Sequence, residues 1–110
     1  MEDSLVALTK EIVKFTKERD WDQFHQPENL AKSIVIEAAE LLECFQWSDE
    51  NYDIEHVKEE LADVFNYAIQ MAYALNLDIK DIIEKKMEKN ALKYPVDKCK
   101  GKSDKYDKLK

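Results

Sequence analysis

The chain is poor in the residues that break regular structure: its 110 residues include one glycine and two prolines. Sheet proteins with many tight turns need these residues at their hairpins, so the scarcity argues against a sheet fold. Charged residues make up 37% of the chain. This composition favours an all-α fold in one small domain. Because so short a chain buries only a limited share of its surface, oligomerisation is expected.

The sequence also lacks a basic excess, long apolar runs and a cysteine framework. The formal net charge is −7, which argues against a nucleic acid polymer as partner but leaves a nucleotide substrate open. No stretch approaches about 18 consecutive apolar residues, so we expect no membrane-spanning helix and no membrane partner. Cys44 and Cys99 are not spaced as metal ligands, and free thiols are ordinary in a reducing cytosol. The acidic start MEDSLVAL has no apolar signal-peptide core, so we expect a cytoplasmic protein.

Apolar residues recur at helical spacing in four segments, near residues 2–19, 27–45, 54–75 and 79–92. Pro27 suits the first turn of the second helix, Asp78 is a good N-cap for the fourth, and Pro95 ends that helix. The run SIVIEAAELL leaves little polar surface, so we expect the second helix to be nearly surrounded by protein. We predict one domain over residues 1–95 and a charged, mobile tail over residues 96–110.

Two acidic pairs stand inside apolar helical stretches. Glu37 and Glu40 lie in IVIEAAELL, and Glu60 and Asp63 lie in EELADVFNY. The i,i+3 spacing puts both members of a pair on one helix face. Uncompensated negative charge among apolar neighbours is costly. Four carboxylates that converge in a helical bundle therefore indicate a site for a hard cation, most simply Mg²⁺.

Other interpretations of these acids stay open. Any one glutamate in so charged a chain is more commonly a surface charge paired with a lysine, although the apolar neighbours of both pairs weigh against this. A di-iron or di-manganese bundle would need Glu-x-x-His on two helices, and the chain has no such motif. A non-catalytic alternative is a helical interaction module whose acidic face binds a basic partner protein.

Aromatic residues and a histidine flank the acidic segments. Trp21 and His25 precede the second predicted helix, Trp47 follows it, and Tyr67 lies four residues past Asp63. Such rings could stack on a nucleobase, with His25 hydrogen-bonded to the base or the sugar. Aromatic residues also dominate small cores, so the residues by themselves favour packing as the explanation.

Lys86 and Asn90 lie one turn apart late in the fourth predicted helix. Cationic and amide donors suit triphosphate oxygens, and cations also suit the negative end of a helix dipole. No Ser–His or Cys–His pair is evident, so a covalent intermediate is not expected.

The wider pattern resembles a known family. Glu37-x-x-Glu40, nineteen intervening residues and Glu60-x-x-Asp63 is similar to the metal-binding signature of the MazG-like all-α nucleoside triphosphate pyrophosphohydrolases. The segments FTKERDWDQFHQPENLAKSIVIEAAELLECFQW and KMEKNALKYPVDKCKGKSDKYDKL resemble its dCTP pyrophosphatase branch, so the similarity runs from about residue 13 to residue 108. The resemblance implies a four-helix bundle that assembles into a dimer or a dimer of dimers, with the active site in the helical cleft.

The resemblance also implies roles for single residues. It assigns the Mg²⁺ ligands to Glu37, Glu40, Glu60 and Asp63. It assigns the substrate contacts to Trp21, His25, Trp47, Tyr67, Lys86 and Asn90. It implies cleavage between the α- and β-phosphates, which yields a nucleoside monophosphate and pyrophosphate. Metal-assisted hydrolysis needs an activated water, for which Glu37 or Glu40 is the candidate base.

The expected substrate is dCTP or a related pyrimidine nucleotide, in nucleotide pool control or house-cleaning. Damaged or modified nucleotides stay open as substrates. The dCTP pyrophosphatase branch uses a histidine on its first helix, and Ile12 stands at the matching position here. This departure bears on which base the chain selects.

Overall fold

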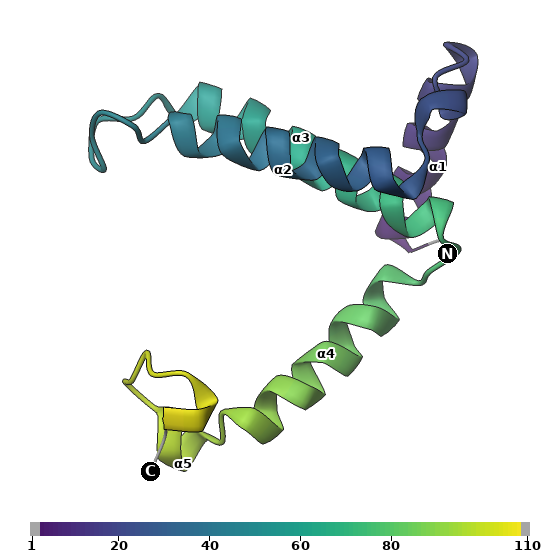
Figure 1. Ribbon diagram of the computed structural model, residues 1–110. Helices are drawn as coiled ribbons and strands as arrows, with labels where there is room; N and C mark the ends of the chain where they lie inside the picture. Colours follow the sequence, from purple (N-terminus) through teal and green to yellow (C-terminus); the bar gives the residue numbers. More distant parts are fainter. Residues whose placement is uncertain (1–2, 109–110) are drawn as a thin grey trace. The chain divides into compact units, whose positions relative to one another are not determined.

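The computed structural model describes residues 3–108, and within them it contains helices and no strand (Figure 1). The elements are α1 (Ser4–Glu18), the 3₁₀ turn η1 (Asp22–Phe24), α2 (Pro27–Glu43), α3 (Ile54–Ala74), α4 (Ile79–Lys93), α5 (Val96–Cys99) and the 3₁₀ turn η2 (Tyr106–Lys108). The predicted all-α fold and its four long helices are confirmed. No helix within the described residues is long and apolar enough to cross a membrane.

Local sequence explains where the helices begin and end. Asp3, Asp53 and Asp78 cap three of the four long helices, and each carboxylate accepts a hydrogen bond from a backbone N–H at 2.9 to 3.0 Å. The fourth, α2, has Pro27 in its first turn, where the missing N–H is no loss. Asn76 adopts a left-handed φ of 56° just after α3, a conformation that asparagine tolerates better than most residues.

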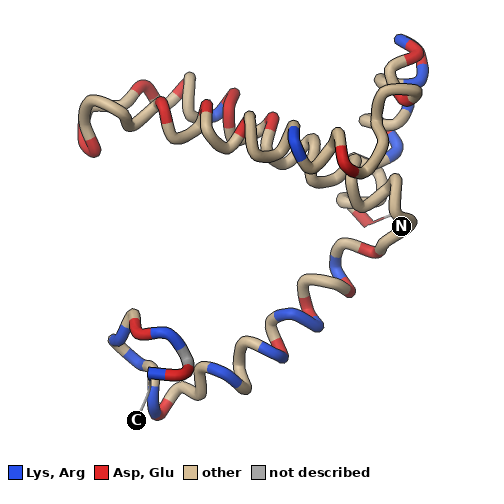
Figure 2. The backbone as a smooth tube through the Cα atoms, viewed as in Figure 1, with Lys and Arg blue, Asp and Glu red and all other residues tan. Residues whose placement is uncertain are grey.

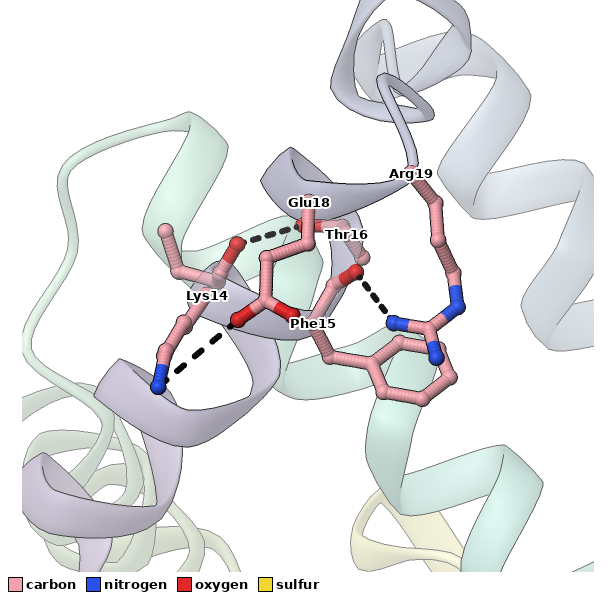
Figure 3. A network of polar contacts seen from close by, with 6 residues as sticks. Lys14, Phe15, Thr16, Glu18 and Arg19 are labelled. Carbon is pink, nitrogen blue, oxygen red and sulfur yellow. Dashed lines mark hydrogen bonds and ion pairs between the residues drawn. The ribbon is translucent and has the colours of Figure 1, made fainter.

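The chain divides into two units, residues 1–77 and residues 78–110, which are described separately. In the first unit α2 and α3 form an antiparallel hairpin, and α1 packs against α3 (Figure 1). The buried core lies where these three helices meet, and it contains Thr16, Leu30, Ile69 and Ala72. The Thr16 hydroxyl is satisfied because it donates to the carbonyl of Val13 at 2.9 Å (Figure 3).

Much of the apolar surface of the hairpin stays uncovered in the single chain. Val35 and Leu42 of α2 expose 69% and 71% of their surface, and Phe65 of α3 exposes 59%. The expectation that the second helix is nearly surrounded by protein is therefore wrong for one chain alone. Because burial of one such side chain contributes about 1.5–3 kcal/mol, these faces are suited to cover by another molecule.

The second unit begins with α4, a helix of alternating charge (Figure 2). Lys85 pairs with Asp81 at 3.0 Å one turn apart. Apolar side chains such as Met87 and Leu92 are exposed on the same helix. The helix α5 and the turn η2 lie in the segment predicted to be a tail, and the proposed boundary at residue 95 stays a prediction.

Candidate metal centre

Helices α2 and α3 bring the two acidic pairs together. One carboxylate oxygen from each of Glu37, Glu60 and Asp63 lies within 4.8 Å of the others. Glu40 lies beside Glu37 and Glu60, since it raises the pKa of both carboxyl groups. All four predicted acids therefore meet at one place on the hairpin, along which acidic residues gather (Figure 2). Their roles as ligands stay a prediction.

The cluster resists full ionisation. Burial, followed by the hydrogen bond to Glu40 and the neighbouring negative charges, raises the pKa of Glu37 to about 7. The pKa of Glu60 is raised as well, first by its hydrogen bond with Glu40 and then by burial. Burial and the mutual repulsion of these carboxylates therefore oppose the ionisation of Glu37 and Glu60 when no cation is bound.

Two oxygens of the cluster have no donor. Oε2 of Glu37 and Oε2 of Glu60 are sealed from solvent and accept no hydrogen bond from the described residues. A buried acceptor without a partner is unfavourable, by roughly 1–3 kcal/mol or more for a charged group. A cation would satisfy both atoms, and a donor set made only of carboxylate oxygens fits a hard ion such as Mg²⁺.

Cys44 lies one turn past Glu40 and is not part of the donor set. Its thiol donates to the backbone carbonyl of Glu40, with an Sγ–O distance of 3.6 Å. Burial raises the pKa of the Cys44 thiol, and the charge of Glu60 raises it further. A protonated thiol is a poor nucleophile and a poor metal ligand, so the chemistry of this centre depends on oxygen.

Tyr67 and His25 border the acids on one side. Burial and then the charges of Glu37 and Asp63 raise the pKa of the Tyr67 phenol, which places Tyr67 beside the cluster. The His25 ring meets the Tyr67 ring edge to face, with ring centroids 6.5 Å apart. His25 also lines a cavity of about 320 Å³ formed by α1, η1 and α3, with Gln70 among its other walls. The predicted neighbours His25 and Tyr67 are therefore adjacent.

Trp21 lies on the outer side of this region. Its ring packs edge to face on Phe15 at 5.9 Å and is 47% exposed. The guanidinium of Arg19 lies 3.6 Å above the Phe15 ring and donates to the Phe15 carbonyl at 3.0 Å (Figure 3). These contacts leave the Trp21 side chain partly exposed to solvent, at the same end of the unit as His25.

Trp47 does not join the other aromatic residues within one chain. It lies in the connection between α2 and α3 and is 89% exposed. His25 precedes α2 and Trp47 follows it, so the 17 residues of that helix separate them by about 25 Å. The two side chains of one chain cannot contact the same nucleobase.

Lys86 and Asn90 both lie on α4, one turn apart and exposed. They belong to the second unit, which is described by itself. Their predicted contact with a triphosphate stays a prediction. His56, which lies beside Glu60, was missed as a neighbour of the cluster, although its i,i+4 spacing to Glu60 was visible in the sequence.

Sequence and fold are similar to those of known pyrophosphatases. A profile of the MazG-like family matches residues 32–109, which include all four acids. The dCTP pyrophosphatase 1 of Mus musculus is 34% identical over 117 residues, covering 98% of this chain and 69% of the mouse protein. The Homo sapiens dCTP pyrophosphatase 1 is 33% identical with the same coverage. A crystal structure of a pyrophosphatase from Archaeoglobus fulgidus is similar with a TM-score of 0.77 and 36% identity, over 86% of this chain and 95% of that one.

Proposed function

Since this chain belongs to the MazG-like family, we propose that it is a nucleoside triphosphate pyrophosphohydrolase. It hydrolyses dCTP or a related pyrimidine nucleotide between the α- and β-phosphates, giving a nucleoside monophosphate and pyrophosphate. The observation that carries the proposal is the meeting of three carboxylates, with Glu40 beside them, two of which have sealed oxygens without a donor among the described residues. The relatives named dCTP pyrophosphatase 1 support this substrate class. We place the activity in cytoplasmic nucleotide pool control or house-cleaning.

Mg²⁺ is the proposed cofactor, held by Glu37, Glu40, Glu60 and Asp63. The donor set supports this choice because it consists of carboxylate oxygens from two facing helices. When bound, the cation supplies charge neutralisation to the triphosphate as negative charge builds on it. Electrostatic stabilisation of this kind needs ligands that are already in place, and the proximity of the carboxylates of α2 and α3 supports this role.

Glu37 or Glu40 orients the attacking water and accepts its proton. Glu40 raises the pKa of both Glu37 and Glu60 and therefore lies beside them, so two carboxylates of α2 are available at the cluster to accept a proton from water. The Cys44 thiol stays protonated and occupied with a backbone carbonyl, which supports water as the nucleophile. Lys86 and Asn90 of α4 are proposed to contact the triphosphate oxygens.

The base lies against Tyr67, His25 and Trp21. Tyr67 adjoins the acids and His25 adjoins Tyr67, so a nucleotide with its phosphates at the cluster meets these rings next. Base–aromatic stacking contributes about 1–3 kcal/mol for each base. The partial exposure of Trp21 leaves its ring available for such a contact.

We propose that the active enzyme is a homodimer or homotetramer and that Trp47 reaches the nucleotide of a neighbouring copy. The separation of about 25 Å along α2 excludes a shared contact with His25 within one chain. A second hairpin packed antiparallel on the first brings its connecting loop to the His25 end. Exposed Val35, Leu42 and Phe65 supply apolar surface for this packing.

The test is a panel assay of pyrophosphate release from natural, methylated and oxidised nucleoside triphosphates. We expect release that depends on Mg²⁺, with the highest rate for a pyrimidine deoxynucleotide. No pyrophosphate from any substrate, together with a melting temperature indifferent to Mg²⁺ plus nucleotide, would favour the alternative of an acidic interaction module.

A further inference from the structure

His56 contacts one of the proposed metal ligands. It lies in the first turn of α3, one helical turn before Glu60, and its Nε2 atom is 3.3 Å from Glu60 Oε1. The His56 side chain is 51% exposed, whereas that of Glu60 is 14% exposed. The imidazole therefore stands at the solvent edge of the cluster and reaches inward to a largely buried carboxylate.

The two oxygens of Glu60 have different surroundings. Oε1 lies 3.3 Å from the His56 Nε2 atom, a nitrogen that can carry a hydrogen toward it. Oε2 is sealed from solvent and has no donor among the described residues. A carboxylate that has one oxygen held by a neighbour and the other oxygen without a hydrogen-bond partner is oriented to bind a cation through the unpaired oxygen. Hydrogen bonds of this kind commonly set the geometry of ligating side chains.

Repulsion within the cluster makes such an anchor useful. One oxygen of Glu60 lies within 4.8 Å of oxygens of Glu37 and Asp63, and Glu40 is close enough to raise the pKa of Glu60. Like charges so close drive a flexible side chain toward solvent. Glu60 has a neighbour outside the four acids in His56, whose Nε2 atom lies 3.3 Å from Glu60 Oε1. The other pairs of α3 and α4 lie on exposed residues.

We propose that His56 is a positioning residue, which fixes the Glu60 carboxylate through Oε1 so that its other oxygen faces the cation. The inference rests on the proposed function, because it assumes that the cluster binds a metal. It assigns His56 no contact with substrate. Its effect is on the affinity for the cation and on the Mg²⁺ concentration that activates the enzyme.

The experiment compares His56→Ala and His56→Gln with wild type in the full-length protein. The Gln side chain keeps an N–H donor at this position, and both replacements are compatible with a helix. Lys58→Ala is the matched control, because Lys58 is two residues away and pairs with exposed Glu55. Mn²⁺ and Mg²⁺ binding is measured by calorimetry in the absence of nucleotide, followed by kcat and KM across a range of Mg²⁺ concentrations.

We expect His56→Ala to weaken metal binding about tenfold, a typical loss for a hydrogen-bond partner of a ligand. His56→Gln should recover most of it, and Lys58→Ala should bind as wild type does. At saturating Mg²⁺ the kcat of His56→Ala should approach that of wild type. Unchanged metal affinity in His56→Ala, or a Gln variant no better than Ala, would overturn the inference. Absence of metal binding in wild type would instead overturn the proposed function.

Discussion

Replacement of Glu37 by glutamine should stabilise the metal-free protein while abolishing its activity. Glu37→Gln keeps the shape of the side chain and removes one of the charges that meet within 4.8 Å. At that separation one pair of charges repels by about 3.5 kcal/mol at an effective dielectric constant of 20 and by about 0.9 kcal/mol in water. The cluster is partly open to solvent, so we expect a net gain of about 1–2 kcal/mol.

A gain of this size is measurable as a melting temperature. For a small domain each kcal/mol shifts Tm by roughly 4–8 °C, so the variant should melt about 5–10 °C above wild type at pH 8 with chelator. Glu59→Gln is the charge-matched control, because Glu59 is an exposed neighbour outside the cluster, and it should melt close to wild type.

Addition of Mg²⁺ should make wild type melt at a higher temperature than Glu37→Gln. Wild type gains about 2.7 kcal/mol at a Mg²⁺ concentration of 100 times Kd, whereas the variant has lost a ligand and gains less. If Glu37→Gln melts at or below wild type without metal, the repulsion inferred from the geometry is absent. If Mg²⁺ raises the melting temperatures of both proteins equally, Glu37 is not a ligand.

Three further predictions follow from the same structure. The metal-free protein should lose stability as pH rises from about 5.5 to 8. The pKa of Glu37 is raised to about 7, so its stabilising contribution is complete below the ordinary value of 4.5 and is lost as pH rises through 7. Melting temperatures measured across this pH range with chelator test the prediction, and a flat profile contradicts it. Leu42→Glu should reduce the assembly to monomers in light scattering, since Leu42 is 71% exposed on the apolar face of α2, and an unchanged mass would exclude this face from the interface. Leu30→Ala should destabilise the protein by about 2–5 kcal/mol in urea unfolding, because Leu30 is 1% exposed in the core. A loss below about 1 kcal/mol would show that the neighbouring side chains move in to fill the cavity.

The helices could be predicted from the sequence because their signals are local. Asp78 caps α4 as expected, and Pro27 and Pro95 stand at helix boundaries. The i,i+3 spacing put each acidic pair on one face. That the two faces meet depends on the antiparallel packing of α2 and α3, which the structure shows.

Other features of the site depend on distances that a sequence does not contain. Trp47 and His25 flank the same helix in the sequence, but that helix separates them by about 25 Å. The exposure of Val35 and Leu42 shows that apolar composition alone does not tell which molecule buries a face. The contact of His56 with Glu60, four residues later, was not predicted, because no motif in the sequence singled out His56.

The central claim is that four carboxylates of one hairpin hold a cation on which hydrolysis depends. Phosphorus NMR of dCTP incubated with the full-length protein, with Mg²⁺ or with excess chelator, tests it directly. The account predicts dCMP and pyrophosphate with Mg²⁺ and intact dCTP with chelator. Equal turnover in chelator, or dCDP and orthophosphate as the products, would contradict it.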